Sequence, residues 1–303
     1  MKKRFIRTLR RVVLLMCAPV FLGRFFSKET GSDYGIGFLR KARLLVRMYR
    51  NRFRVVTASG LLDQVVMVTE ILRVPRGITG AVVECGSFQG GSTVNLSLVC
   101  GLVGRKLHVF DSFAGLPEPS TADKLHILPS IKELRAFEKG DFCGTLETVK
   151  SNVQRYGSLG VCQFHVGYFD KTMPVFTDPC VFAFCDVDLR SSLETCVEHL
   201  WPLLADRCYL FTHEANHMEI ASLFFDSWWW QEHLQTSSPG LVGGGSGLGL
   251  YVSDQGFFRS SIGFATKNIR PVDFATSGSV NPCLLSEPVA SRETRHPGSR
   301  LIP

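Results

Sequence analysis

The sequence lacks the cysteine patterns of a disulfide-stabilised miniprotein or a structural zinc site. Ten Cys are spread over 303 residues, and no two of them have the CxxC spacing. Glycine and proline, at 28 and 14 residues, are too few for a fibrous or disordered chain. Scattered thiols of this kind are typical of a reduced protein, so we expect a cytoplasmic globular enzyme or binding protein.

No hydrophobic run near the N-terminus is long enough to span a bilayer. The run at residues 12–22 has 11 positions and is interrupted by Pro19, whereas a spanning helix needs about 20 residues. Basic residues precede this run, as they do in a signal peptide, but no small-x-small cleavage site follows it. The segment therefore favours an amphipathic element over a membrane anchor or a leader.

Acidic residues are nearly absent from the first 54 positions. Glu29 and Asp33 stand against 15 Lys and Arg, a net charge of +13, while the rest of the chain carries −6. Residues 36–55 mix basic and apolar side chains, which is typical of an amphipathic helix and not of a nucleic-acid-binding segment. We expect residues 1–56 to form helices that act as a lid, pack against the domain or a second copy, or contact an anionic membrane peripherally through residues 1–35.

Helical and strand patterns alternate from residue 57 to residue 275. Short apolar runs predict strands at 81–83, 107–110, 161–166, 181–185 and 208–211, and helical spacing predicts helices at 61–72, 93–102, 146–156, 193–203 and 218–230. Thr57 or Ser59 is available to cap the first of these helices. The alternation predicts an α/β domain with a doubly wound, mostly parallel, Rossmann-like sheet.

Two segments after this domain core have weaker patterns. Apolar runs at 248–252 and 262–266 have a hairpin-like interval and predict an antiparallel edge strand. Residues 276–303 are rich in Ser, Pro, Gly and Arg, and predict a disordered tail.

A glycine turn follows the first predicted strand. Residues 84–93 read as a strand end, a glycine-bearing turn and a helix start, but the GxGxxG spacing of dinucleotide binders and the P-loop lysine are missing. A nucleoside ligand without a pyrophosphate fits this turn better. Asp111 ends the second strand, 25 residues after Gly86, where a carboxylate is suited to accept hydrogen bonds from ribose hydroxyls.

Acidic and imidazole groups follow the fourth and fifth predicted strands. If these strands are neighbours, Asp186, His213 and Glu214 converge on one rim and form a candidate divalent-metal site. For Asp188 we expect a structural role, capping the next helix together with Ser191 and Ser192.

Four segments together resemble the macrocin O-methyltransferase (TylF-type) family of S-adenosylmethionine-dependent enzymes, from about residue 57 to residue 266. They are VECGSFQGGS at 83–92, FDSFAGLPEP at 110–119, GYFDKTMP at 167–174 and DVDL at 186–189. The resemblance implies a class I methyltransferase fold, methyl transfer to a hydroxyl of a sugar-bearing or other small-molecule acceptor, and self-association.

The resemblance also implies roles for individual residues. Glu84, Gly86 and Ser92 would contact the methionine end of S-adenosylmethionine, Asp111 the ribose, and the turn at His165–Gly167, with Val166, the adenine. Ser87, Gly91 and Ser112 would be further cofactor-binding residues.

In that family a magnesium ion lies between the aspartate that matches Asp186 and two adjacent acidic residues, whose positions are held here by His213 and Glu214. Imidazole suits manganese or another softer metal better than magnesium. Three outcomes stay open: such a metal, a metal-free enzyme with His213 as general base, or a binding or regulatory protein that has lost the activity. A membrane-associated interaction protein is a further alternative.

Overall fold

The computed structural model describes residues 22–120, 123, 137–215, 217–243, 251–252, 258–259 and 262–268, with 251–252 and 258–259 described by their backbone alone. The chain divides into two compact units, Met1–Lys267 and Asn268–Pro303, and every helix and strand given below belongs to the first. The predicted disordered tail and the first 21 residues of the predicted membrane-contact segment lie outside the described residues.

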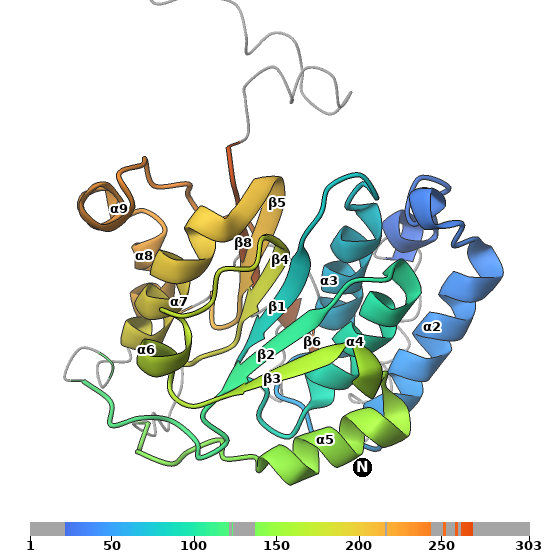
Figure 1. Ribbon diagram of the computed structural model, residues 1–303, viewed down its shortest axis with the longest axis horizontal. Helices are drawn as coiled ribbons and strands as arrows, with labels where there is room; N and C mark the ends of the chain where they lie inside the picture. The colour runs from blue at the N-terminus through green and yellow to red at the C-terminus, as the bar shows by residue number, and fades with distance from the viewer. Residues whose placement is uncertain are drawn as a thin grey trace, which may run out of the picture. The chain divides into compact units, whose positions relative to one another are not determined.

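Six strands form one sheet, in the order β3-β2-β1-β4-β5-β8 (Figure 1). The strands are β1 (Ala81–Cys85), β2 (Leu107–Asp111), β3 (Cys162–Val166), β4 (Cys180–Cys185), β5 (Leu204–Thr212) and β8 (Gly263–Thr266). β1 to β5 pair in parallel, whereas β8 pairs antiparallel with β5. The predicted fold class is confirmed. The strand order reverses between β1 and β4, and doubly wound sheets bind ligands at such a switch point.

We predicted that the runs at 248–252 and 262–266 add an antiparallel edge to the sheet. The second run forms that edge as β8, but the first, within its described residues, does not pair with β8. Its described part, β6 (Tyr251–Val252), pairs with β7 (Phe258–Arg259) in a separate two-stranded sheet. On its other side β8 meets only an isolated bridge within the described chain, between Val242 and Phe264. A short apolar run indicates a strand but does not specify which strand it pairs with.

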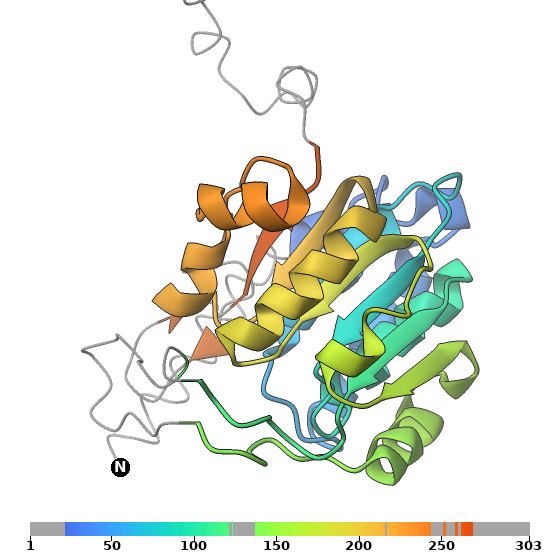
Figure 2. The same ribbon diagram turned by 60° about the vertical axis from the view of Figure 1, so that its left-hand side comes forward.

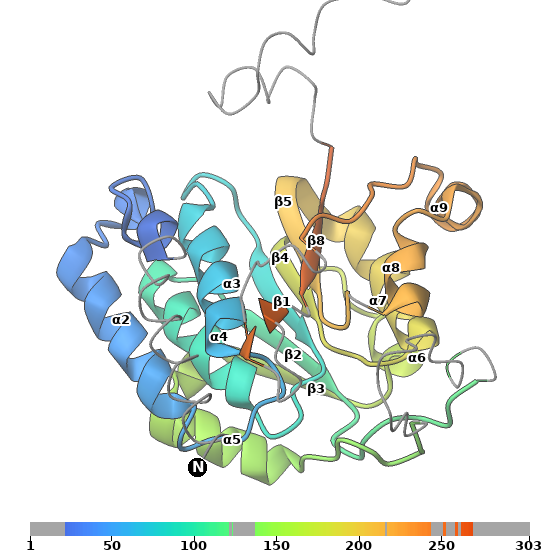
Figure 3. The same cartoon turned by 180° about the vertical axis from the view of Figure 1, so that it is seen from behind.

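Helices cover both faces of the sheet (Figures 1, 2 and 3). One layer contains α2 (Phe38–Asn51), α3 (Leu61–Arg73) and α4 (Gly91–Val103), with α5 (Leu146–Tyr156) beside α4. The other contains α6 (Phe169–Thr172), α7 (Arg190–Leu203), α8 (Met218–Leu223) and α9 (Ser227–Leu234). Short 3₁₀ helices lie at η1 (Ser32–Tyr34) and η3 (Leu159–Val161). Successive strand residues point to opposite layers. Val82 packs in the core cluster that includes α2, α3 and α4, and Val83 packs in the cluster that includes α7, α8 and α9.

The single helix predicted at 218–230 is wrong, because the chain breaks it into α8 and α9. The Asp226 side chain caps α9 by accepting a hydrogen bond from Trp229 N at 3.1 Å. Trp230 is fully buried and donates from Nε1 to the Leu223 carbonyl at 2.7 Å. The indole thus donates a hydrogen bond to a carbonyl oxygen in the last turn of α8 that has no partner within the helix. Sequence periodicity alone does not reveal this contact.

The predicted cap of α3 is also wrong. The N-cap residue is Gly60, whose backbone N–H donates to Asp63 Oδ2 at 2.9 Å. Thr57 and Ser59 instead accept hydrogen bonds from the Gln64 side chain, at 3.1 and 2.9 Å. Among the described residues, no helix is both long enough and apolar enough to cross a bilayer.

The layer formed by α7 depends on close packing. Leu200 is completely buried in it, among side chains of the sheet and of α9. We expect Leu200→Ala to lower the free energy of unfolding by about 2–5 kcal/mol, since it removes buried methyl groups and leaves a cavity. Urea denaturation measures this change. Val175→Ala, at a position 79% exposed, should change stability by less than about 0.5 kcal/mol; equal losses at both positions would contradict this packing.

Candidate active site

The turn after β1 lies against the end of β4. Gly86 has a φ of 86°, and a Cβ on it would overlap the backbone carbonyl oxygen of Asp186. Backbone hydrogen bonds continue the pairing past both strands, because Asp186 N donates to Cys85 O at 2.8 Å and Gly86 N to Phe110 O at 2.9 Å. Only glycine tolerates both the left-handed conformation and this close approach.

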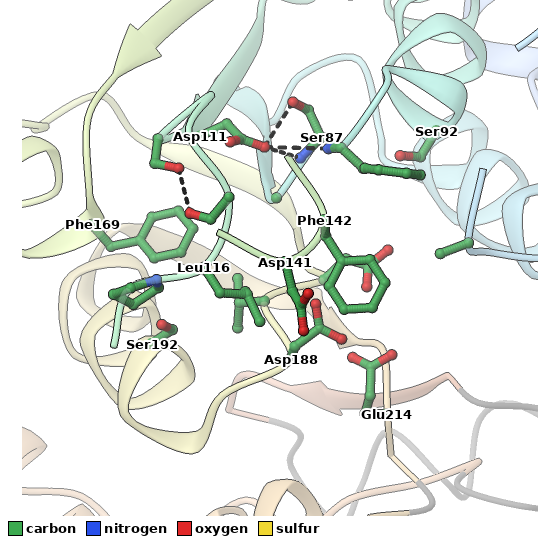
Figure 4. A pocket seen from close by; sticks show the side chains of 18 of the residues that line it. Ser87, Ser92, Asp111, Leu116, Asp141, Phe142, Phe169, Asp188, Ser192 and Glu214 are labelled. Atoms are coloured by element: carbon green, nitrogen blue, oxygen red, sulfur yellow. Dashed lines mark hydrogen bonds between the residues drawn. The ribbon is translucent and has the colours of Figure 1, made fainter. Parts of the chain in front are cut away.

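Asp111 holds the glycine turn in place. Its Oδ2 accepts hydrogen bonds from Ser87 N at 2.6 Å, Ser87 Oγ at 2.8 Å and Phe88 N at 3.3 Å (Figure 4). Its Oδ1 accepts from Phe113 N at 2.7 Å. These bonds use much of the carboxylate, which we predicted to bind ribose. A carboxylate offers about four acceptor positions, so Oδ1 keeps capacity for a ligand.

A cleft opens at this edge of the sheet (Figure 4). It contains about 870 Å³ of empty space, counting the part open to solvent. Of the predicted cofactor residues, those that line it are Gly86, Ser87, Gly91, Ser92, Asp111 and Ser112. Thr57 and Ala58 reach the cleft from the segment after α2, and a Cβ on Gly91 would overlap the Thr57 side chain.

Val166 and Gly167, predicted to contact adenine, do not line the cleft. Val166 is 56% exposed, and the next two residues of the turn, Tyr168 and Phe169, line the cleft instead. His165 turns back to the sheet, where its Nε2 lies 2.9 Å from His108 Nδ1.

Glu84 lies beneath the cleft and not in its lining. It is fully buried, and no described group makes a hydrogen bond of acceptable geometry with either carboxyl oxygen. Burial raises its pKa to about 8, against the opposing effect of the nearby Ser92 and Thr93 hydroxyls. A buried carboxyl whose pKa is strongly raised by desolvation is a candidate functional group.

The structure brings Asp186, His213 and Glu214 together, as the sequence predicts. Their candidate ligand atoms lie within 4.8 Å of one another. His213 Nδ1 lies 3.1 Å from Asp186 Oδ1 and makes a short contact with Glu214 Oε1. Asp186 and Glu214 line the cleft, whereas His213 does not.

Electrostatics disfavour one of the three outcomes left open by the sequence, the metal-free enzyme with His213 as general base. Burial lowers the pKa of its imidazole, but the charges of Asp186 and Glu214, and their hydrogen bonds, raise it well above the usual value. The raised pKa favours the protonated imidazole, whose charge pairs with the two carboxylates.

Asp188 belongs to the cleft, which corrects the capping role that we predicted. The N-cap residue of α7 is Leu189, and the first turn of this helix is held by Asp123, which accepts from Arg190 N at 2.9 Å and Ser191 Oγ at 3.2 Å. Asp188 lines the cleft, and burial together with the charges of Glu214 and Asp186 raises its pKa well above the usual value. Ser192 lines the cleft too.

Four residues of the cleft lining adopt left-handed backbone conformations without being glycine. They are Phe88, Phe142, Asp188 and Glu214, with φ values of 47°, 56°, 60° and 51°. Such strain persists where the surrounding structure imposes it, and it concentrates at functional sites. It marks the acidic end of the cleft as a site built for a ligand.

Sequence reasoning missed Asp141 altogether. Its carboxylate lies with those of Asp188 and Glu214 at one end of the cleft (Figure 4). Asp141 comes from the segment before α5, far from any strand end, so its position in the sequence gives no signal. For Asp188, the sequence gives one indication that it belongs to the cleft, because it lies only two residues after Asp186.

The family model described as "Macrocin-O-methyltransferase (TylF)" matches residues 56–236, more than half of the chain. A search of the curated proteins finds no match. The fold is similar to those of solved structures at low sequence identity. The O-methyltransferase NovP is 16% identical over 69% of this chain and 78% of its own, with a TM-score of 0.49.

Two further structures are similar at lower scores. The calicheamicin methyltransferase CalS11 is 14% identical over 75% of this chain and 79% of its own, with a TM-score of 0.44. The O-methyltransferase TomG from Streptomyces achromogenes, in complex with SAM, is 12% identical over 74% and 90%, with a TM-score of 0.42.

The close approach at Gly86 gives a stability prediction. Gly86→Ala should lower the free energy of unfolding by more than about 2 kcal/mol, because alanine pays about 1–2 kcal/mol for the left-handed conformation and also collides with Asp186. Gly104→Ala is the matched control, since Gly104 has a φ of 69° but nothing within 4 Å of the added Cβ. If chemical denaturation gives equal losses for both variants, Gly86 makes no such contact.

Buried Glu84 predicts a pH dependence of stability. The folded protein holds the Glu84 proton up to about pH 8, whereas the unfolded chain loses it near 4.5, so stability should fall as pH rises between these values. Glu84→Gln keeps the shape, cannot ionise, and should flatten that fall. Urea denaturation at several pH values measures it, with exposed Glu147→Gln as the control. An unchanged slope in Glu84→Gln would show that Glu84 is not the source.

Proposed function

The chain belongs to the macrocin O-methyltransferase family of S-adenosylmethionine-dependent enzymes, and from this premise we propose that its cleft transfers a methyl group to a hydroxyl of a sugar-bearing small molecule. The chain is thus a methyltransferase. One observation carries the proposal. A single cleft joins a glycine turn suited to a nucleoside to a cluster of carboxylates suited to a hydroxyl.

The glycine end fits the cofactor. The backbone at Gly86 and Gly91 leaves no room for side chains, so a ligand can approach it closely. Several carboxylates nearby favour a cationic sulfonium and ammonium. We assign cofactor binding to Gly86, Ser87, Gly91, Ser92, Asp111 and Ser112, as the sequence predicts. For the adenine we propose Tyr168 and Phe169, which line the cleft, in place of Val166 and Gly167.

When bound, S-adenosylmethionine supplies a methyl group on a sulfonium, ready for in-line displacement by an oxygen nucleophile. The protein's task is then to hold the acceptor oxygen in line and to remove its proton. Asp188 is suited to take that proton, because it lines the cleft and its raised pKa makes its carboxylate a stronger base. Asp186 and Glu214, held by protonated His213, would accept hydrogen bonds that orient the hydroxyl.

The same cluster also fits a divalent metal. Asp186, His213 and Glu214 offer two oxygen donors and one nitrogen donor, a set that suits manganese, iron or zinc better than magnesium. Imidazole binds a metal only when neutral, so a bound ion would replace the His213 proton. Such an ion would lower the pKa of an acceptor hydroxyl.

Titration calorimetry on chelator-treated protein tests this proposal. We expect S-adenosylmethionine to bind the wild type, and MnCl₂ to give a separate binding signal that Asp186→Asn loses while cofactor binding persists. Asp170→Asn is the control, because this exposed carboxylate on α6 pairs with Lys171 away from the cleft.

The outcomes separate the two parts of the proposal. Absence of cofactor binding would overturn the assignment of the cleft. Cofactor binding without a manganese signal would instead leave Asp188 as the base of a metal-free reaction.

A further inference from the structure

The helix α2 presents a broad apolar face to solvent. Phe38, Leu39, Val46, Tyr49 and, in the turn after the helix, Phe53 are between 51% and 70% exposed. At 3.6 residues per turn, these positions fall within one arc of about 100°. Figures 1 and 3 show α2 at the outer edge of its helix layer. A contiguous apolar face of this kind usually marks an interaction surface.

The opposite face of α2 is firmly attached to the domain. Leu44 and Met48 are buried in the core, and Lys41 Nζ donates to the carbonyl oxygens of Ser27 at 2.6 Å and Thr30 at 3.0 Å. Asn51 Nδ2 donates to Asn95 Oδ1 of α4 at 2.9 Å. These contacts fix the orientation of α2, so its apolar face points away from the domain.

A row of arginines borders the apolar face. Arg40, Arg43, Arg47, Arg50 and Arg54 follow one another at intervals of three or four residues, so they share one side of the helix. Between Asp33 and Asp63 the sequence contains no acidic residue. Two of these arginines also contact Tyr156: Arg47 donates to its carbonyl oxygen at 3.4 Å, and the Arg54 guanidinium lies 5.2 Å from its ring.

Charge decides which partner fits this surface. A second copy of the chain, docked through the same face, would bring one arginine row against another. A nucleic acid would match the arginines but leave Phe38, Leu39 and Val46 against polar phosphates. An anionic lipid surface supplies phosphate charge for the arginines and an acyl boundary for the apolar side chains. The first 21 residues add six Lys and Arg and no acid, which favours the same partner.

We propose that the α2 face, defined as Phe38, Leu39, Val46, Tyr49, Phe53 and the bordering arginines, is a docking surface for membranes that contain anionic phospholipids. Each basic residue near such a membrane contributes about 1 kcal/mol, and the apolar side chains add their burial at the headgroup boundary. This docking does not depend on the proposed methyl transfer, so either can fail without the other.

Vesicle co-sedimentation of the full chain tests the docking. The wild type should bind vesicles of phosphatidylcholine mixed with phosphatidylglycerol, and should bind pure phosphatidylcholine vesicles much more weakly. Arg43→Glu/Arg50→Glu should lower the partition coefficient at least about 10-fold, since two attractive charges become repulsive. Leu39→Ser/Phe53→Ser should lower it while keeping the dependence on phosphatidylglycerol, because it removes apolar burial alone.

Matched variants elsewhere control for charge and hydrophobicity. Lys139→Glu/Lys171→Glu makes the same charge change at exposed positions off α2, and Phe225→Ser/Trp228→Ser removes two exposed aromatic side chains near α9. Both should bind vesicles like the wild type. Thermal denaturation checks that each variant folds.

Four results would overturn the proposal. The wild type could fail to bind anionic vesicles, or the α2 variants could bind as well as it does, which would assign binding to residues 1–21. The α2 variants could dissociate an oligomer in analytical ultracentrifugation without losing vesicle binding, which would identify the face as a contact between copies. An oligonucleotide could bind the wild type in preference to vesicles and lose that binding in the arginine variant.

Discussion

The contact between Gly86 and the carbonyl oxygen of Asp186 is the constraint on which the site depends. It joins the turn after β1 to the end of β4, at the point where the strand order reverses. The backbone hydrogen bond from His213 N to Cys185 O then carries the pairing on to β5. Because these bonds link three neighbouring strand ends, the nucleoside-type turn and the acidic cluster must face one cleft. The two halves of a transfer reaction thus adjoin because of sheet topology, and no separate domain or hinge is needed to join them.

The acidic cluster places several carboxylates close together, and their burial and repulsion destabilise the charged forms. Asp141, Asp186, Asp188 and Glu214 line one cleft, and two of these residues hold left-handed backbone conformations. The raised pKa values of Asp188 and Glu214 follow from burial and from the charges of neighbouring carboxylates. A cationic ligand or a metal would relieve that repulsion, which is the expected balance for a site that binds a sulfonium and activates a hydroxyl. Glu84, buried nearby, has its pKa raised to about 8 by desolvation.

Basic and acidic residues are concentrated in different parts of the chain. Five carboxylates line the cleft, whereas the basic groups of the first 54 residues lie in α2, before it and in the turn after it. Thr57 and Ala58, which line the cleft, follow the α2 face directly along the chain. A membrane-docked α2 would therefore hold the enzyme by a surface connected to the cleft by a few residues, without using any residue of the acidic cluster.

The sequence by itself determined the order of elements and the composition of each strand end. Apolar runs and helical spacing depend on neighbouring residues, so β1 to β5, α5 and the convergence of Asp186, His213 and Glu214 followed from it. Only the tertiary structure decided the features that depend on residues distant in the sequence. Asp123 replaced Asp188 at the start of α7, two carboxylates raised the pKa of His213, and Asp141 reached the cleft from a loop. Hydrogen bonds and charges act through space, and no local pattern encodes a partner that lies dozens of residues away.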